Sequence, residues 1–386
     1  MNNRQALVTL CVAGFVGNVS FSLLFPVLPY YAQGMGASPS QVGLILASYS
    51  YVTAIALIPF GMLSDRVGHL KMLIIGLALY TSVPLLYPLA SDLTHLGLVC
   101  ALHGFACAVF SPAAITLALD TSTQERWGEA LGLFTTATQS ALVVGPVLGG
   151  LLLNHYGFTT AFYSCSGIPL VGLIFVLFRL TTIQPAEARK VISTVSRKWL
   201  KQPPVLAGLM APFFFTMGSG TILTFMPLYS QGLGVAKTGA GIIVAAVYIG
   251  SALLRVPGGK LSDKIGRRLV MLLGLVVSFT AIILISFMNS FLGLVVAAIF
   301  YGAGMGIAVP AAYALVADLT PAEVRGLTMG ITTSFLHGGL ALGPTIMGVV
   351  ASIRDYGTMF RACGLSLILG IIVVLSLTQK RHWTQT

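Results

Sequence analysis

Twelve long apolar stretches run through this chain and decide what it can fold into. A helix needs about 20 mostly apolar residues to cross a bilayer core roughly 30 Å thick. The chain is 56% hydrophobic and only 8% charged, whereas soluble domains carry about 25% charged residues. We therefore predict an all-α membrane protein with twelve transmembrane helices. Their expected bounds are residues 6–31, 39–62, 70–90, 94–119, 129–154, 159–180, 204–230, 237–258, 268–289, 291–317, 327–352 and 358–378.

The positive charges are placed unevenly among these helices. With a cytoplasmic N-terminus, the tails and the even-numbered loops hold all but four of the 21 Lys and Arg residues, the exceptions being Lys237, Arg255, Arg354 and Arg361. Cytoplasmic loops of membrane proteins carry such an excess, so we expect a multi-pass cell-membrane protein with both termini in the cytoplasm. The net charge of +11 then serves orientation and contact with anionic membrane lipids. We expect no nucleic-acid partner.

A short charged loop occurs twice. GMLSDRVG at residues 61–68 returns as GKLSDKIG at residues 259–266, an offset of 198. Other positions keep this offset, among them Gly43 and Gly241, Gly104 and Gly302, Asp120 and Asp318, Gly145 and Gly343, and Pro146 and Pro344. A constant register is an internal repeat, and six helices per copy make the repeats parallel. We predict six-helix bundles at residues 1–180 and 204–386, joined by a cytoplasmic linker at residues 181–203.

The repeated pattern G-x-L-S-D-x-x-G, between the second and third helices and again between the eighth and ninth, resembles the signature of the major facilitator superfamily. The resemblance covers the whole chain, with six plus six helices and a central linker. It implies two bundles related by a pseudo-twofold axis along the membrane normal. It also implies alternating access, in which the bundles rock about a cavity near the membrane midplane.

We expect the repeated loops to form a cytoplasmic gate. Glycines allow tight turns and close approach of helices, and an acid near a helix N-terminus can accept hydrogen bonds from exposed amides. The family resemblance implies that Asp65 meets the helix at 327–352, and symmetry implies that Asp263 meets the helix at 129–154. The alternative is a pair of solvated turns. The expected gate residues are Gly61, Asp65, Arg66, Gly68, His69, Asp120, Gly259, Asp263 and Arg267.

The first loop departs from the family pattern at one position. The family usually carries Arg four residues after the Asp, as the second loop does with Arg267, but the first loop has His69. We expect His69 either to pair with Asp120 or to face water. The charge of a histidine there would vary between about pH 5 and 8.

The fifth helix carries a pattern of small residues. It resembles the antiporter signature of drug/proton exchangers, G-x8-G-x3-G-P-x2-G-G, with alanine in place of the middle glycine. Small residues let helix backbones pack closely, and proline allows a bend. Close packing without any role in exchange is the alternative. The matching residues are Gly132, Ala141, Gly145, Pro146, Gly149 and Gly150.

The expected substrate cavity is apolar with a few polar points. Asn18, Ser22 and Phe25 recur at helical spacing, which places them on one face of the first helix. Each such residue can instead be plain core packing. Lipophilic or weakly cationic compounds would suit this lining better than charged phosphates. The expected cavity residues are Asn18, Ser22, Phe25, Tyr49, His103, Gln139, Phe215, Tyr248, Tyr301 and His337.

Proton coupling would need titratable groups within the membrane, where ionisable residues are rare and usually functional. No carboxylate lies in the middle of a predicted helix. The candidate proton carriers are therefore His103 and His337, with Asp120 nearer the cytoplasm. The alternative is that each histidine is a packed core residue, which a lone histidine in a helix is more often than it is a proton carrier.

The sequence favours a transporter over an enzyme, because no H-E-x-x-H, G-x-S-x-G or Walker motif occurs. We predict a secondary exporter of hydrophobic or weakly cationic small molecules, driven by proton antiport, in a bacterial inner membrane. The alternatives are an uptake carrier or uniporter for a neutral metabolite, and a membrane receptor without transport. We expect a monomer without cofactor. A metal site is not expected, since the five cysteines form no C-x-x-C pair.

Overall fold

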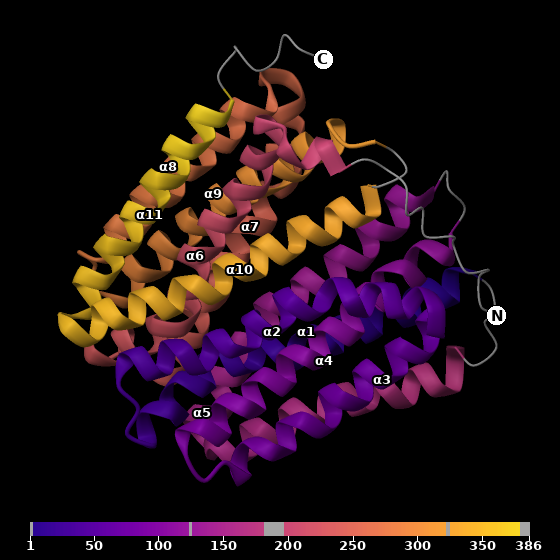
Figure 1. Ribbon diagram of the computed structural model, residues 1–386. Helices are drawn as coiled ribbons and strands as arrows, with labels where there is room; N and C mark the ends of the chain where they lie inside the picture. The colour runs from indigo at the N-terminus through magenta and orange to yellow at the C-terminus, as the bar shows by residue number, and fades with distance from the viewer. Residues whose placement is uncertain (1–2, 123–125, 181–196, 322–324, 379–386) are drawn as a thin grey trace. The chain divides into compact units, whose positions relative to one another are not determined.

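The computed structural model describes residues 3–122, 126–180, 197–321 and 325–378, and within these ranges the secondary structure is helical, without strands. The α-helices, drawn in Figure 1, are α1 (Asn3–Gly34), α2 (Pro39–Val67), α3 (His69–Ser82), α4 (Leu93–Asp120), α5 (Trp127–Leu180), α6 (Pro203–Gly232), α7 (Lys237–Ile265), α8 (Arg267–Ile285), α9 (Phe291–Asp318), α10 (Arg325–Ile353) and α11 (Tyr356–Leu377). Two 3-10 helices are η1 (Val83–Leu89) and η3 (Arg197–Lys201). The predicted all-α fold class is confirmed.

Helix α5 contains two membrane crossings. It runs over 54 residues, which corresponds to about 80 Å of helix and far exceeds a bilayer core of roughly 30 Å. Gly157 breaks it with φ 83° and ψ −177°, angles that glycine adopts readily. The two parts match the predicted helices at residues 129–154 and 159–180. The other ten α-helices, α3 taken together with η1, are also long and apolar enough to cross a membrane.

The backbone turns repeat with the offset of the sequence. Among the glycines with positive φ, Gly36 pairs with Gly234 and Gly68 pairs with Gly266, each 198 residues apart. Gly68 (φ 104°) directly precedes α3, and Gly266 (φ 94°) directly precedes α8. Residues with a Cβ rarely adopt such angles. These two glycines are therefore required for the sharp turns that follow the charged loops.

The described chain forms two compact units. The first unit holds residues 3–36, 48–180 and 236–245, and the second holds residues 37–47, 197–235 and 246–378. The first turns of α2 thus belong to the second unit, and the first turns of α7 belong to the first unit. The two exchanged segments occupy nearly equivalent places in the repeat. The predicted bounds of 1–180 and 204–386 do not include this exchange and stay a prediction, and most of the linker lies outside the described residues.

Hydrogen bonds between helices tie the first unit together. In this unit α1 packs along α5. Ser20 Oγ donates to Cys165 O at 2.7 Å, and Cys165 Sγ donates to Ser20 O at 3.0 Å. Both side chains are completely buried, so the pair satisfies two backbone carbonyls away from water. The second unit has its main contacts between α6 and α10 and between α8 and α9.

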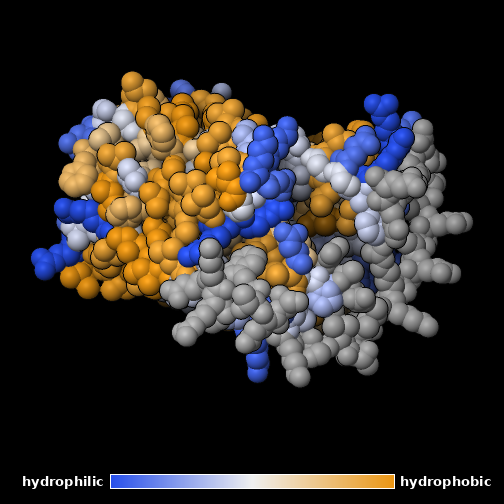
Figure 2. All heavy atoms as spheres, turned by 90° about the horizontal axis from the view of Figure 1, so that it is seen from above, coloured by the Kyte–Doolittle hydropathy of each residue, from blue (hydrophilic) through white to orange (hydrophobic). Residues whose placement is uncertain are grey.

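Large apolar side chains are exposed along the helices. Ile55 and Phe178 of the first unit are 74% and 82% exposed, and Leu292 of the second unit is 70% exposed. Figure 2 shows hydrophobic atoms over much of one face, with hydrophilic residues gathered in separate groups. An apolar surface of this extent needs a partner other than water. Together with the length of the helices, it makes this a multi-pass membrane protein.

Candidate functional site

The first charged loop lies at the end of α2. His69 Nδ1 is 2.8 Å from Ser64 Oγ, and His69 Nε2 is 3.9 Å from Asp65 Oδ1. Ser64 is buried, whereas Asp65 and His69 are half-buried and Arg66 is exposed. The histidine thus bridges to the serine and the acid of its own loop.

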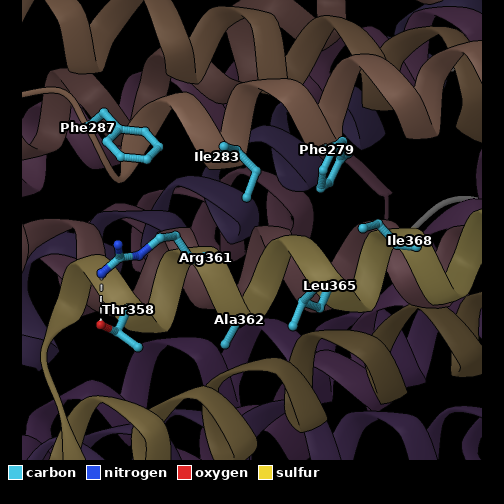
Figure 3. A pocket seen from close by; sticks show the side chains of 8 residues that line it. All are labelled: Phe279, Ile283, Phe287, Thr358, Arg361, Ala362, Leu365 and Ile368. Atoms are coloured by element: carbon cyan, nitrogen blue, oxygen red, sulfur yellow. Dashed lines mark hydrogen bonds between the residues drawn. The ribbon is translucent and has the colours of Figure 1, made fainter.

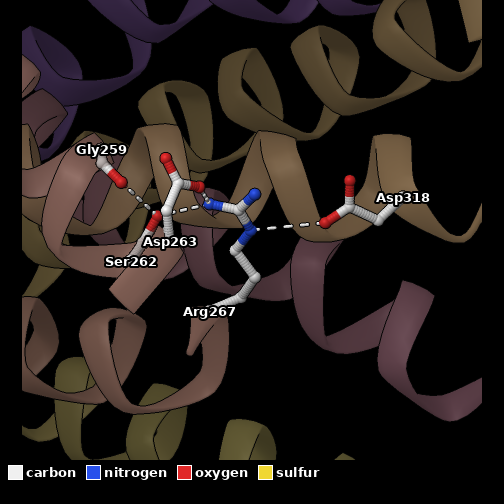
Figure 4. Close-up of polar contacts among 5 residues, drawn as sticks. All are labelled: Gly259, Ser262, Asp263, Arg267 and Asp318. Carbon is white, nitrogen blue, oxygen red and sulfur yellow. Dashed lines mark hydrogen bonds and ion pairs between the residues drawn. The ribbon is translucent and has the colours of Figure 1, made fainter. Parts of the chain in front are cut away.

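The second charged loop has a denser network, drawn in Figure 4. Arg267 pairs with Asp263, donates to Ser262 Oγ at 2.7 Å, and donates through Nε to Asp318 Oδ2 at 3.3 Å. Ser262 in turn donates to Gly259 O at 2.8 Å. Asp318 is the last residue of α9. Arg267 therefore ties the end of α7 to the end of α9, which a guanidinium with its five N–H donors can do and an ammonium does less well.

The glycines of the two loops differ in what they do. Gly68 and Gly266 make the turns described above. A Cβ on Gly61 would have ordinary contact with Pro112 at 3.7 Å, and a Cβ on Gly259 would meet no atom within 4 Å. Among the described residues, the expected close helix approach is therefore absent at Gly61 and at Gly68, where a Cβ would also meet no atom within 4 Å. Asp120 ends α4 as Asp318 ends α9.

Helix α5 crosses α1 in very close contact. A Cβ on Gly145 would lie 2.0 Å from Ser22 Oγ, and a Cβ on Gly149 would lie 2.1 Å from Leu23 O. Ala141 is completely buried, and its carbonyl accepts from Ser22 Oγ at 3.0 Å. Real Cβ atoms do not approach other atoms so closely, so only glycine fits at positions 145 and 149.

The same stretch of α5 also packs closely against the first turns of α7. A Cβ on Gly241 would lie 2.2 Å from Pro146 O, and a Cβ on Gly150 would lie 2.7 Å from Lys237 O. The ammonium of Lys237 lies 5.9 Å from the ring centre of Tyr30 and 5.6 Å from that of Phe158. Both distances suit cation–π attraction. We call this contact the α5–α7 crossing.

The second unit contains the equivalent contact between α10 and the first turns of α2. A Cβ on Gly43 would lie 2.2 Å from Pro344 O, and a Cβ on Gly348 would lie 2.8 Å from Pro39 O. Ser40 N also donates to Ser352 Oγ at 2.8 Å. This α10–α2 crossing repeats the α5–α7 crossing at an offset of 198 residues, although proline stands where the other crossing has Lys237.

Gly132 does not take part in this packing. It is exposed, and a Cβ there would meet no described atom within 4 Å. The prediction of close packing is therefore wrong at this first position of the signature, while Gly145, Gly149 and Gly150 have close neighbours.

Three expected cavity residues lie in helix contacts. Ser22 is completely buried and donates to Asn18 O at 2.7 Å as well as facing Ala141 O. Tyr301 and Phe215 are completely buried in the second unit, where the Tyr301 hydroxyl donates to Phe215 O. Because all three side chains are completely buried and the hydroxyls of Ser22 and Tyr301 already have partners in the protein, these residues hold helices together and are corrected to packing residues.

The remaining cavity residues divide by burial. Phe25 and Tyr49 are 9% and 6% exposed. Phe21, which was not predicted, contacts both of them. It stacks on Tyr49 with ring centres 4.0 Å apart, and its ring meets that of Phe25 edge-on with centres 4.7 Å apart. Asn18, Gln139, Tyr248 and His337 are half-buried. In the described chain, His337 Nδ1 is buried without a hydrogen-bond partner.

His103 is completely buried among aromatic rings. Its ring centre lies 5.3 Å from Tyr80 and 5.7 Å from Tyr49, and its Nδ1 lies 3.1 Å from the hydroxyl of Tyr87 in η1. His103 Nε2 has no hydrogen-bond partner among the described residues. Sequence spacing gave no signal for Tyr87, because it approaches His103 from a separate 3-10 helix.

A family model described as Major Facilitator Superfamily matches residues 10–235 and again residues 208–386. The chain belongs to the major facilitator superfamily. The two matches overlap in α6 (Pro203–Gly232), and together they cover both copies of the internal repeat. Within the described residues, no group of three His, Cys, Asp or Glu side chains is placed to hold a metal ion.

Members of this superfamily with similar sequences include two proteins named for drug resistance. The multidrug resistance protein MdtG of Klebsiella pneumoniae is 26% identical over 400 aligned residues, covering 98% of this chain and 94% of MdtG. The multi-drug resistance efflux pump PmrA homolog of Lactococcus lactis is 27% identical over 385 residues, covering 96% of this chain and 93% of the relative.

The fold is similar to a solved structure of a bacterial homolog of the human lysosomal transporter Spinster, in an inward-facing and occupied conformation. The TM-score is 0.81 at 17% sequence identity, and the match covers 99% of each chain. At this identity the likeness establishes the fold alone. The family match and the long apolar helices make the protein a membrane transporter of the major facilitator superfamily.

Proposed function

We propose that this chain exports hydrophobic or weakly cationic small molecules by alternating access, in exchange for protons. The observation that carries the proposal is the packing of α5, in which Gly145, Gly149 and Gly150 of the antiporter-type pattern each have a neighbour that excludes a side chain. The names of the relatives, multidrug resistance protein and efflux pump, support export of drug-like compounds. Transport, not catalysis, is the proposed role.

In the proposed mechanism, contacts at the cytoplasmic ends of the helices close one side of the membrane, and contacts at the opposite ends close the other side. Asp65 and Asp263 would meet helix N-termini of the other half when the cytoplasmic side closes, in the way that a carboxylate favours a helix N-terminus. The α5–α7 and α10–α2 crossings would close the opposite side. A contact that forms in only one of two conformations shifts the equilibrium between the two conformations. The contacts of Asp65 and Asp263 and the two helix crossings would therefore all influence the rate of exchange.

The proposed substrate site uses the half-buried side chains of Asn18, Gln139, Tyr248 and His337, together with Phe25 and Tyr49. A pocket of aromatic rings and few polar groups suits lipophilic compounds, and aromatic faces attract weak cations. The proposed residues include no Arg or Lys, which disfavours phosphorylated metabolites.

The proposed proton carriers are His103, His337 and Asp120. The surroundings of His103 support this role, since Nδ1 faces the Tyr87 hydroxyl and Nε2 has no partner among the described residues. Movement of the surrounding helices would admit water to Nε2 and let it titrate, because histidine changes charge near neutral pH.

The proposed setting is a bacterial inner membrane, with both termini in the cytoplasm and the protein acting as a monomer. The positive charges of the tails and of the even-numbered loops support this orientation.

Thermal unfolding and counterflow test the proposal. We expect lipophilic cations such as ethidium to raise the melting temperature of the purified protein, because a ligand stabilises the state that it binds. In proteoliposomes loaded with unlabelled ethidium, external labelled ethidium should enter faster than in unloaded ones. A rise in melting temperature without counterflow would indicate a receptor, and an effect of neutral sugars but not of ethidium would indicate a metabolite carrier.

A further inference from the structure

A groove opens on the second unit between α8 and α11, and Figure 3 shows its walls. It has a volume of about 420 Å³, within the range of roughly 300–1,000 Å³ that ligand pockets have. Helices α8 and α11 pack directly against each other. Apolar side chains form most of the lining, and they are Phe279, Ile283, Phe287, Ala362, Leu365 and Ile368.

The groove has the length of one membrane leaflet. On α11 it extends from Thr358 to Ile368, ten residues that rise by about 15 Å, which is half of a bilayer core roughly 30 Å thick. Phe287 lies near the end marked by Arg361, and Phe279 lies near the other end (Figure 3). The groove therefore begins close to the start of α11 and ends near the middle of the membrane.

Arg361 marks the outer end of the groove and, among the residues that the structure describes, is the only charged one in its lining. It is exposed, and its Nη2 donates to Thr358 Oγ1 at 2.9 Å. Thr358 Oγ1 donates to Asp355 Oδ2 at 2.8 Å, so Asp355 holds the threonine while it caps α11. A guanidinium has five N–H donors, and the bond to Thr358 uses one. The others suit the oxygens of a phosphate, which arginine binds in a bidentate manner.

We propose that this groove binds a diacyl phospholipid with an anionic headgroup, with one acyl chain along the apolar walls and the phosphate on Arg361. The apolar length of one leaflet and the positive charge of Arg361 at its outer end match the two parts of such a lipid. The groove shares no lining residue with the proposed gate or substrate cavity, and the proposal does not depend on the transport proposal.

Native mass spectrometry of the full chain in detergent tests the site, with dioleoyl phosphatidylglycerol as the probe. We expect one lipid to be retained per protein. Arg361→Gln should lower its apparent affinity about tenfold, through loss of charge-assisted hydrogen bonds. The matched control is Arg354→Gln, an exposed arginine near the start of α11 that does not line the groove, and its effect should stay within about twofold. Equal loss in both variants would overturn the proposal.

A second pair of variants tests the apolar part. Ala362→Trp should fill the groove and weaken retention, whereas Leu369→Trp, at a 56% exposed position outside the lining, should not. Dioleoylglycerol, which lacks the phosphate, should bind more weakly and be insensitive to Arg361→Gln. Retention unchanged by Ala362→Trp, or glycerol 3-phosphate binding as well as the whole lipid, would contradict a lipid site. Melting temperatures near that of the unmodified protein would show that each variant is folded.

Discussion

The second half holds Arg267 between Asp263 and Asp318, whereas the first half places His69 beside Ser64 and Asp65. The same division recurs deeper in the helices, where His103 of the first half stands at the position of Tyr301 in the second. An arginine stays charged at every relevant pH, and a histidine does not. By contrast, the close crossings at Gly145 and Gly343 are matched. The halves thus share their packing and differ in the residue at these two equivalent positions, which is histidine in the first half and arginine or tyrosine in the second.

The largest expected effect is on the shared packing. Gly145→Leu should lower exchange roughly 100-fold, because a misplacement of about 1 Å can cost that much and a Cβ there would lie 2.0 Å from Ser22 Oγ. Gly343→Leu should be as severe, since a Cβ there would lie 2.1 Å from Met217 O. Counterflow rates in proteoliposomes measure both.

Two control variants test whether the loss of exchange is specific to the closely packed glycines. At Gly167 and at Gly132 a Cβ would meet no described atom within 4 Å, so Gly167→Leu and Gly132→Leu should exchange at nearly the normal rate. If Gly145→Leu and Gly167→Leu behaved alike, the crossing would have no special role in exchange.

The next effect concerns the histidines. The double change His103→Gln plus His337→Gln should retain substrate binding and lower pH-driven accumulation to the passive level. It keeps polar groups of similar size but removes both titrations, and a group that never changes charge cannot carry a proton. Tyr301→Phe is the control at the equivalent position, because it removes a buried hydroxyl without removing a histidine. Accumulation at the normal rate in the double variant would refute histidine coupling, and Asp120→Asn would be measured next.

A smaller effect is expected at the acids of the loops. Asp65→Asn should slow transport about fivefold, which corresponds to roughly 1 kcal/mol for a carboxylate at a helix N-terminus. Asp263→Asn should have less effect, because Arg267 would still reach Ser262 and Asp318. Transport rates are compared at equal amounts of folded protein. Normal transport by Asp65→Asn would exclude a latch at this acid.

The smallest effect tests the difference between the loops directly. His69→Arg would give the first loop the residue of the second. Exposed ion pairs contribute only about 0–1 kcal/mol, so the rate near pH 7 should change less than about fivefold. The rate should vary less between pH 5 and 8 than in the unmodified protein, since arginine keeps its charge. A pH profile that is identical in the two proteins would contradict a functional difference between histidine and arginine in these loops.

The helices, the repeat and the superfamily followed from the sequence because each rests on a local pattern. Apolar length predicted the crossings, and the offset of 198 residues predicted the paired turns at Gly68 and Gly266. The pattern around Gly145 and Pro146 predicted close packing, which the contacts with Ser22 and Gly241 bear out.

The side-chain environments did not follow, because spacing along one helix does not reveal what approaches from another. Ser22 shares a helix face with Asn18, yet it is covered by α5. Tyr301 and Phe215 are aromatic residues at transmembrane positions, yet both are buried in the core, where the Tyr301 hydroxyl donates to the backbone carbonyl of Phe215. Tyr87 meets His103 from η1, and the docking of Lys237 on Tyr30 and Phe158 depends on an exchange of segments that no short motif encodes.

Accumulation driven by an imposed pH gradient tests the central claim of proton-coupled export most directly. Proteoliposomes with an acidic lumen are placed in neutral buffer with ethidium, and the ethidium inside is followed over time. An antiporter lets protons leave as substrate enters, so we predict accumulation above the passive level, abolished when nigericin removes the gradient. Equal entry with and without the gradient, or accumulation only when the gradient is reversed, would contradict proton antiport.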